Sequence, residues 1–288
     1  MNFSQLFEEL KCRPSSTYKD IFNRLKICFK IRMEDFIENR KHTNRGRKRI
    51  INWDKFFDCL FGICDNGFKM SYIKEYYHMS KSTYYYYFDL ITREHFIEHI
   101  YNEIVTNHCQ IDSKGYLITD TFTVKSMDGS EGLGRNPTDR GRKGFKVSLI
   151  CDQNLVTHAV HIETANTHDS KILVPTIMGS ISDLKGFICL ADSGYAGQKY
   201  ISNIMGQTKV KLISKPKRTS NKSIMSHNLS VDDSTLLNQK RNHIERLNGN
   251  IRRFRGLMIK YTKKISSYVT YLYVALACIT CHRLFIRR

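Results

Sequence analysis

The sequence predicts an α/β fold, with a domain built on a mixed sheet and an all-α region before it. Three observations lead to this class. Apolar residues recur at helical spacing through the first part of the chain, short runs rich in β-branched and aromatic residues follow in the middle, and the last part is helical again. At 288 residues the chain suggests about two domains on a prior of roughly 150 residues each. We place them at residues 1–112 and 113–288.

The composition indicates a polyanionic partner. The formal net charge of +19 and the pI near 9.5 favour nucleic acid, with acidic lipid as the other polyanion to consider. The N-terminus is mixed and acidic rather than a signal peptide, and the most apolar tract, 268–281, is too short to span a bilayer. Nine scattered cysteines fit a reducing compartment. We expect no secretion and no membrane partner, and a location in the cytoplasm of a bacterium or the nucleus of a eukaryote.

A basic segment at 40–49 follows the first amphipathic stretch, 17–38. Its polar character predicts a linker or an arm. Arginines are drawn to the negative potential of narrow A·T-rich minor grooves, so such an arm can contact DNA. The candidate contacts are Arg45, Arg47, Lys48 and Arg49. A solvated run of charge is the alternative interpretation.

The pattern over residues 53–91 predicts a helix-turn-helix. A regular helix face at 53–64 is followed by a short helix near 72–77, a turn, and a third helix at 82–91. Two short helices joined by a turn of about four residues form the layout whose second helix enters the major groove. The candidate DNA contacts at the start of that helix are Lys81, Ser82 and Thr83. A plain helical bundle with aromatic packing is the alternative.

The order of elements after residue 113 is that of an RNase H-like fold, in which a mixed sheet brings carboxylates from two central strands together. The predicted strands are 116–126, 144–151, 155–164, 187–191 and 210–214. The predicted helices are 168–180, 198–205, 239–258 and an apolar helix from 266, with a polar irregular insertion at 215–238.

Three carboxylates in this part of the chain could meet at one point. Asp120 and Asp192 each end an apolar, strand-like run, and Glu245 lies on the predicted helix 239–258. Glu245 is next to Ile244, about 100° of helix rotation away, which places it at the margin of the buried face. An ordinary solvated face with an Arg241–Glu245 pair is the alternative for this helix. Three such carboxylates could hold Mg²⁺, and two ions could clamp a phosphodiester during in-line displacement.

Several motifs together resemble those of DDE transposases of the bacterial insertion-sequence kind, most closely the "five" group. The resemblance runs from about Thr119 to Arg283. The motifs are Asp120-Thr-Phe-Thr-Val-Lys-Ser126, Gly141-Arg-Lys-Gly-Phe-Lys146, Thr164-Ala-Asn-Thr-His-Asp169, Ala191-Asp-Ser-Gly-Tyr195 and Arg241-x3-Glu245-x6-Arg252. The resemblance implies an RNase H-like catalytic domain in which Asp120, Asp192 and Glu245 are the catalytic, metal-binding triad.

The resemblance also implies an activity and its partners. It implies cleavage and strand transfer on double-stranded DNA, acting on terminal inverted repeats and target DNA with two Mg²⁺ ions, for which Mn²⁺ would substitute. No small-molecule cofactor is expected, and bringing two DNA ends together implies at least a dimer. Two positions depart from the family pattern: Asn238 stands where a tyrosine is usual, and Arg252 stands where a lysine is usual.

Some polar residues in these motifs can be interpreted in two ways. Basic residues at the second strand and on the glutamate helix are candidate phosphate contacts, with a solvated strand edge or helix face as the alternative. They are Arg142, Lys143, Lys146, Arg241 and Arg252. His168 and Asp169 would cap a helix or contact metal.

Two other functions are compatible with the sequence. One is a sequence-specific DNA-binding protein that derives from a transposase and no longer cuts, and the other is a general nuclease of the same fold. The intact carboxylates argue against the first. The helix-turn-helix pattern and the basic arm argue against the second.

Overall fold

The structure, a computed structural model, describes residues 3–11, 17–39, 51–127, 131–137, 139–217, 226–240, 242–260 and 262–286. The chain forms two compact units, each described here by itself. The helical unit comprises Met1–Asn107, Arg253–Met258 and Lys264–Arg288, and the sheet unit comprises His108–Arg252 and Ile259–Lys263. This division differs from a single boundary near residue 112, because two C-terminal segments belong with the N-terminal helices.

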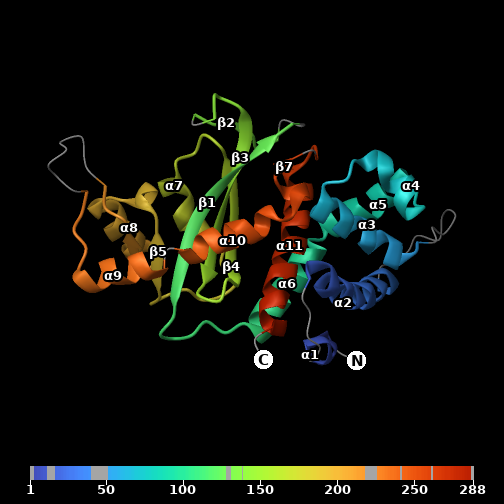
Figure 1. Cartoon of the computed structure of the whole chain (residues 1–288), viewed down its shortest axis with the longest axis horizontal. Coiled ribbons are helices and arrows are strands. Elements are labelled where there is room, and N and C mark those ends of the chain that lie inside the picture. Colours follow the sequence, from blue (N-terminus) through green and yellow to red (C-terminus); the bar gives the residue numbers. More distant parts are fainter. Residues whose placement is uncertain are drawn as a thin grey trace. The chain divides into compact units, whose positions relative to one another are not determined.

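The helical unit contains all helices before the sheet and the last helix of the chain (Figure 1). They are α1 Phe3–Lys11, α2 Tyr18–Glu38, α3 Trp53–Asn66, the 3₁₀ turn η1 Met70–Tyr72, α4 Ile73–Tyr77, α5 Lys81–Arg93, α6 Phe96–His108, the turn η3 Arg255–Leu257 and α11 Ile265–Ile286. These bounds confirm the predicted helices at 17–38, 53–64, 72–77 and 82–91 to within a few residues.

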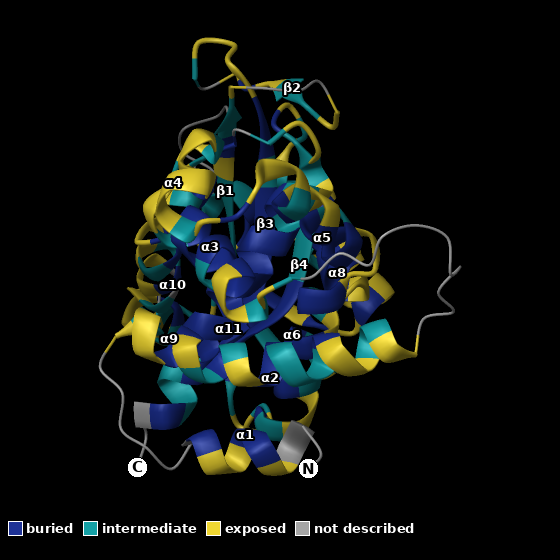
Figure 2. Cartoon of the chain, turned by 90° about the vertical axis from the view of Figure 1, so that its right-hand side faces the viewer, coloured by how far each residue is buried: buried dark blue, intermediate teal, exposed yellow. Residues whose placement is uncertain are grey.

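Helix α11 is the apolar centre of the helical unit. It packs against α2, α3 and α5, and its middle is buried (Figure 2). By length and composition Ile265–Phe285 could cross a membrane, but 72% of its most apolar window is buried inside the protein, as in a core helix. The helix has 22 residues, longer than the predicted tract 268–281.

Helix α5 follows α4 after the turn at 78–80, and the assignment of this pair as a helix-turn-helix stays a prediction. Gly67 ends α3 with φ +69°, a left-handed conformation that favours glycine. Ser80 caps α5 by accepting a hydrogen bond from the Thr83 backbone N–H at 3.1 Å. In the tyrosine run, Tyr84 and Tyr87 are buried and Tyr85 and Tyr86 are about half exposed. The use of this layout for binding DNA stays a prediction.

The sheet unit is built on one mixed sheet, which confirms the α/β class. Its strands are β1 Tyr116–Ser126, β2 Gly134–Arg135, β3 Lys143–Asp152, β4 Thr157–Thr164, β5 Ile188–Ala191, β6 Lys211–Ser214 and β7 Ile259–Lys260. The long strand β1 lies between antiparallel β3 and parallel β5. Outside these, β4 pairs with β3 antiparallel and β6 pairs with β5 parallel.

Helices cover both faces of this sheet. On one face, Leu117 of β1 belongs to a buried cluster that includes Leu173 of α7 (Asp169–Met178) and Ile204 of α8 (Gln198–Thr208). Side chains alternate along a strand, so Asp120 points to the other face, where α10 (Asn242–Arg252) packs on β1. Figures 1 and 2 show α10 and α8 on opposite sides of the sheet.

Two predictions for the region before the last helix are wrong. The polar stretch 215–238 is not irregular throughout, because its end forms helix α9, Val231–Lys240, capped by Ser230. The predicted helix 239–258 is also not continuous, since α10 ends at Arg252. The apolar spacing continues to residue 258 because segment 253–258 packs in the helical unit. There a Cβ on Gly256 would lie only 2.2 Å from the Ile63 carbonyl oxygen.

Candidate functional site

A cavity of about 100 Å³ lies within the sheet unit where β1 and β5 diverge. Its lining comes from β1, the end of β5, α9 and α10. The lining residues are Ile118, Thr119, Asp120, Leu190, Ala191, Asp192, Leu237 and Glu245. The three carboxylates singled out by the sequence therefore line the same cavity, although 125 positions separate the first from the last (245 − 120).

The two aspartates reach the cavity because of how the central strands pair. Strand β5 pairs with β1 only from Tyr116 to Ile118, so β1 loses this neighbour just before Asp120. Asp192 follows β5 directly and caps a short 3₁₀ turn, η2 Ser193–Tyr195. Its Oδ1 accepts a hydrogen bond from the Gly194 backbone N–H at 2.8 Å.

Glu245 comes from the first turn of α10, and the contacts of that helix with β1 set its position. Leu247 and Ile251 are buried. At the start of the helix, the Tyr116 hydroxyl and His243 Nδ1 form a hydrogen bond of 3.1 Å. One turn after Glu245, the side-chain amide of Asn248 donates to Asp120 Oδ2 at 2.8 Å. Glu245 itself is exposed and lies beside this packed face, as its spacing from Ile244 predicted.

Asp120 has an unusual electrostatic environment. Its Oδ1 accepts from the Thr121 backbone N–H at 2.8 Å. Burial is the main reason why the pKa of its carboxyl rises from 3.8 to about 6, and the charges of Asp192 and Asp169 raise it further against the two hydrogen bonds. A buried carboxylate that faces other carboxylates is stabilised in its charged form by a cation.

The donor chemistry of the cavity fits a hard divalent ion such as Mg²⁺, which takes oxygen ligands. Asp120, Asp192 and Glu245 supply carboxylate oxygens. Next to them, the buried Oδ1 of Asn248 has no hydrogen-bond partner among the residues that the structure describes. As the side chains lie, no three Asp, Glu, His or Cys residues in the described part of the chain are close enough to enclose an ion. Binding would therefore draw the carboxylates closer together.

A second polar cluster lies on the other side of β1. Thr121 Oγ1 donates to Asp169 Oδ1 at 2.9 Å, and Lys146 Nζ donates to the same oxygen at 2.8 Å. Lys146 Nζ also donates to the Thr167 carbonyl at 2.8 Å. Its side chain is only 17% exposed. The predicted contact of Lys146 with phosphate stays a prediction, but the ammonium already has two partners in the protein.

His168 and Asp169, which were predicted to cap a helix or contact metal, have different roles in the structure. His168 is the N-cap of α7, because its Nδ1 accepts from the Ser170 backbone N–H at 3.2 Å. Asp169 is the first residue of the helix, and its side chain instead accepts hydrogen bonds from Thr121 of β1 and Lys146 of β3.

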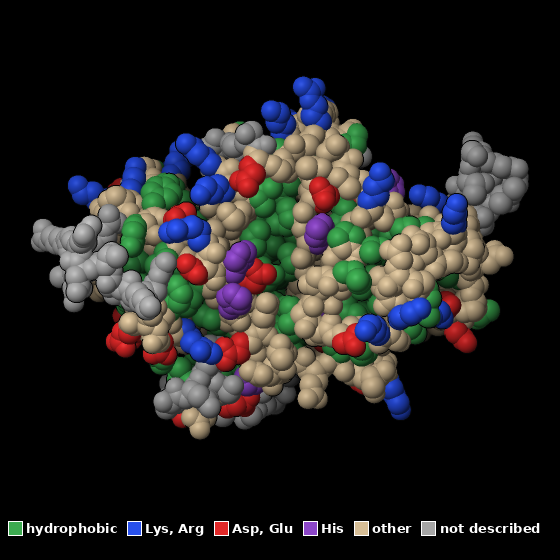
Figure 3. Space-filling view, turned by 180° about the vertical axis from the view of Figure 1, so that it is seen from behind, with side chains coloured by type: hydrophobic (Ala, Val, Ile, Leu, Met, Phe, Trp, Pro, Cys, Tyr) green, Lys and Arg blue, Asp and Glu red, His purple; other side chains and the backbone are tan. Residues whose placement is uncertain are grey.

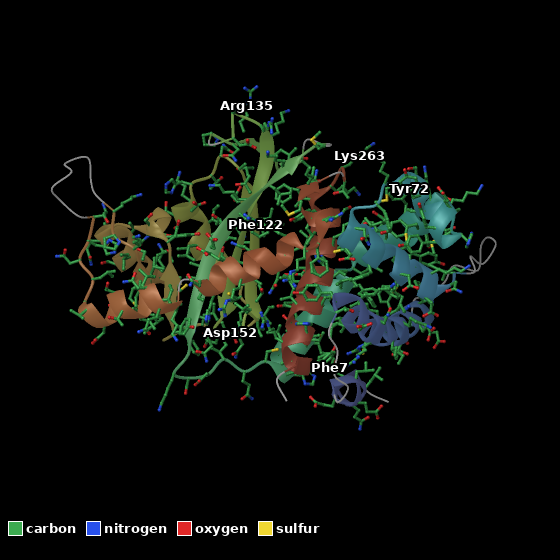
Figure 4. The ribbon with its side chains drawn as sticks, in the orientation of Figure 1. Phe7, Tyr72, Phe122, Arg135, Asp152 and Lys263 are labelled. Carbon is green, nitrogen blue, oxygen red and sulfur yellow. The ribbon has the colours of Figure 1, made fainter. Side chains whose placement is uncertain are left out.

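The other predicted contacts are spread over the molecule. Arg142, Lys143 and Arg252 are exposed on the sheet unit, and Figure 4 shows the nearby Arg135 at the tip of β2. Lys81 and Ser82 are exposed and Thr83 is half-buried, all in the helical unit. Lys and Arg side chains are scattered among acidic ones over the face in Figure 3. The remaining predicted contacts lie outside the described residues: Arg45, Arg47, Lys48, Arg49 and Arg241.

Sequence reasoning gave no role in the site to three residues that lie near the two aspartates. Asn248 is on the predicted glutamate helix, and Thr121 and Tyr195 belong to longer motifs. Tyr195 is buried near Asp169, Asp120 and Asp192, which together with burial raise the pKa of its hydroxyl. The three-residue spacing of Asn248 from Glu245 was a usable signal, because residues three apart on a helix are neighbours. No comparable signal marks Thr121.

Comparison with known proteins shows similarity to a protein family and to a solved structure. The family described as "Transposase DDE domain" matches residues 108–279, more than half of the 288-residue chain. A solved structure described as "Cryo-EM structure of piggyBac transposase synaptic complex with hairpin DNA (SNHP)" is similar with a TM-score of 0.55 at 11% identity, over 88% of this chain and 70% of that one. At this identity the likeness shows a shared fold. No curated protein sequence matches the chain.

Proposed function

Since the chain belongs to the family of transposase DDE domains, we propose that it is a DNA transposase that cuts and joins DNA with divalent metal. The observation that carries the proposal is the shared cavity: Asp120, Asp192 and Glu245 come from three distant stretches and line one space. The family relation and the RNase H-like order of strands support the same assignment. Asp120, Asp192 and Glu245 are then the metal ligands and the catalytic triad.

In this proposal the two aspartates hold the metal from the sheet and Glu245 completes the site from α10. Two bound Mg²⁺ ions, or Mn²⁺ in their place, would activate water or a DNA 3′-hydroxyl and stabilise the leaving oxygen. The protein's own part is positioning. The Thr121 N–H and the Asn248 amide each hold one oxygen of Asp120, and the Gly194 N–H holds one oxygen of Asp192. No covalent link between protein and DNA is needed.

The DNA partner is proposed from charge and from the structural neighbour. The net charge of +19 favours phosphate binding. The neighbour is a transposase in a synaptic complex with DNA, which supports double-stranded DNA ends as the partner here and an assembly of at least two chains on it. Exposed Arg142, Lys143 and Arg252 would contact phosphates, and α5 would read the duplex. The protein would act where DNA is, in a bacterial cytoplasm or a eukaryotic nucleus.

Cleavage of a labelled duplex that carries the DNA flanking this gene tests the proposal. Reactions contain Mg²⁺, Mn²⁺ or Ca²⁺, with Glu245→Gln as the variant and Glu34→Gln, at an exposed position on α2, as the matched control. We expect cuts at the flanking ends in Mg²⁺ or Mn²⁺ that disappear only in Glu245→Gln. Tight, salt-sensitive binding without any cut would instead identify a DNA-binding derivative. Cutting without preference for the flanking ends would identify a general nuclease.

A further inference from the structure

We propose that Asp169 is a positioning residue that fixes the ends of β1 and β5 relative to each other, and with them the two aspartates of the site. This inference rests on the proposed function and extends it to a fourth carboxylate. Asp169 acts by contacting the neighbours of Asp120 and Asp192 rather than by binding metal. Lys146 holds Asp169 in place.

The first link runs through Thr121 on β1. The hydroxyl of Thr121 donates to Asp169 Oδ1 at 2.9 Å, while the backbone N–H of the same residue donates to Asp120 Oδ1 at 2.8 Å. One residue therefore binds both carboxylates, which lie on opposite faces of the strand. Fixing the Thr121 side chain restrains the peptide that orients Asp120.

The second link runs through the turn after β5. A Cβ added to Gly194 would lie 2.9 Å from Asp192 Oδ1 and 3.6 Å from Asp169 Oδ2, so the two carboxylates face the same turn. The Gly194 N–H also donates to Asp192 Oδ1 at 2.8 Å. Asp169 thus binds the residue after Asp120 through Oδ1, and its Oδ2 lies near the turn residue two positions after Asp192.

Lys146 gives Asp169 a fixed place and a balanced charge. It lies on β3 opposite Thr123, so it projects on the same face of the sheet as Thr121. Its ammonium binds Asp169 Oδ1 and the Thr167 carbonyl, each at 2.8 Å, and ties the loop before α7 to the sheet. The Asp169 side chain is 30% exposed and that of Lys146 17%, so this ion pair is less screened than one at the surface.

A simpler role for Asp169 would be to stabilise the start of α7 with its charge, as acidic residues do in first turns. The cap of that helix is His168, however, and the Asp169 carboxylate accepts its hydrogen bonds from β1 and β3. The two roles make different predictions for Thr121, which has no part in stabilising α7.

The test combines Thr121→Val, which removes only the hydroxyl, with Asp169→Ala and the double variant. Thr121→Ser keeps the donor and Asp169→Asn keeps an acceptor oxygen. Asp232→Ala, in the first turn of α9, is the matched control. We expect each disruptive change to lower kcat for cleavage about 100-fold with KM for DNA unchanged, since small displacements of reacting groups have this effect. The double variant should be no worse than either single one, because both remove the same link. Thr121→Ser should restore wild-type kcat.

A second measurement does not depend on cleavage. Hydrogen exchange at the Thr121 and Gly194 amides, followed by NMR on the protein without DNA, reports the bonds that hold Asp120 and Asp192. We expect exchange about tenfold faster at both amides in Asp169→Ala and Thr121→Val, at unchanged global stability. Unchanged exchange at both amides, or additive losses in the double variant, would overturn the positioning role. A wild-type protein that cuts no DNA would refute the proposed function alone, and the exchange result would still decide this one.

Discussion

Two aspartates on the same pair of strands, buried Asp152 and partly buried Asp120, differ in what surrounds them. On β3, Asp152 lies opposite Leu117, and on β1, Asp120 lies opposite Leu149. Asp152, labelled in Figure 4, is 1% exposed. Its Oδ1 accepts from the backbone N–H groups of Asn154 and Val156 at 2.8 and 3.0 Å, and its Oδ2 accepts from the Asn154 amide. These donors hold the turn between β3 and β4.

Asp120 accepts fewer hydrogen bonds than Asp152, and it has other negatively charged carboxylates nearby. It accepts two hydrogen bonds, and the neighbouring carboxylates raise its pKa together with burial. The comparison separates two uses of a buried carboxylate. Donors within its own turn satisfy Asp152 and stabilise the fold. Asp120 faces carboxylates across a cavity, so its charged form is costly until a cation binds.

The largest expected effect is on cleavage. Replacing Asp120 with Asn, Asp192 with Asn or Glu245 with Gln should each lower the cleavage rate by more than about 1,000-fold, because metal-bound charge stabilisation is lost. Affinity for DNA, measured by fluorescence anisotropy in Ca²⁺, should stay within about threefold, since phosphate contacts elsewhere dominate it. A variant that cuts at near the normal rate would remove its residue from the site.

The second effect is on stability and concerns Asp152. Changing Asp152 to Ala should lower the free energy of unfolding by about 3 kcal/mol, because it leaves two buried N–H groups of the turn without an acceptor. Urea denaturation at pH 7 measures this change. Cleavage per folded molecule should remain normal. A specific loss of cleavage with normal stability would contradict the structural role of Asp152.

A smaller change in the opposite direction is expected for Asp120. Its pKa in the folded protein is raised from 3.8 to about 6, so ionisation costs folding free energy as pH rises through about 4 to 6. Without metal at pH 8, Asp120→Asn should therefore be more stable than the wild type by about 1 kcal/mol. Below about pH 4, where the wild-type carboxyl is protonated in both states, the difference should vanish. Urea denaturation in EDTA across this pH range measures it, and a variant less stable at pH 8 would count against the raised pKa.

The smallest expected effect comes from adding a negative charge beside Asp120. Asn248→Asp replaces the donor to Asp120 with another carboxylate, so we expect stability in EDTA at pH 8 to fall by about 1 kcal/mol. Mg²⁺ should then raise the melting temperature of this variant more than that of the wild type, because a metal-bound native state gains stability by mass action. Asn248→Leu, which adds no charge, is the control and should show no enhanced response. Equal Mg²⁺ responses in all three proteins would place Asn248 away from the metal.

The sequence was sufficient for the elements that carry the triad. The bounds predicted for β1 are those of the structure, and Asp192 directly follows β5, as its apolar run predicted. Asp120 lies inside β1 rather than at its end, just after the point where β1 stops pairing with β5. The glutamate helix was located correctly, but its end was not. The spacing of apolar residues indicates which residues are buried but not which unit buries them. Phe254 was therefore assigned to the glutamate helix, although it belongs to the helical unit.

The role of Asp169 could not be predicted for a related reason. An acidic residue at the start of a helix has the same local pattern whether it caps the helix or binds a distant strand. Its partners, Thr121 and Lys146, are 48 and 23 positions away and come together only through the pairing of β1 and β3. Lys146 was predicted to contact phosphate, with a solvated strand edge as the alternative, since nothing local marks a lysine as half-buried.

The path of the chain limits how this protein can be divided into fragments that fold independently. The backbone passes from one compact unit to the other after Asn107, Arg252, Met258 and Lys263. A fragment cut to the family match at residues 108–279 would carry most of α11 without the N-terminal helices against which it folds. We expect such a fragment to aggregate rather than yield a working catalytic module. For the same reason, the N-terminal region cannot be exchanged between relatives by a single fusion point, so recombined or engineered versions must inherit both ends of the chain together.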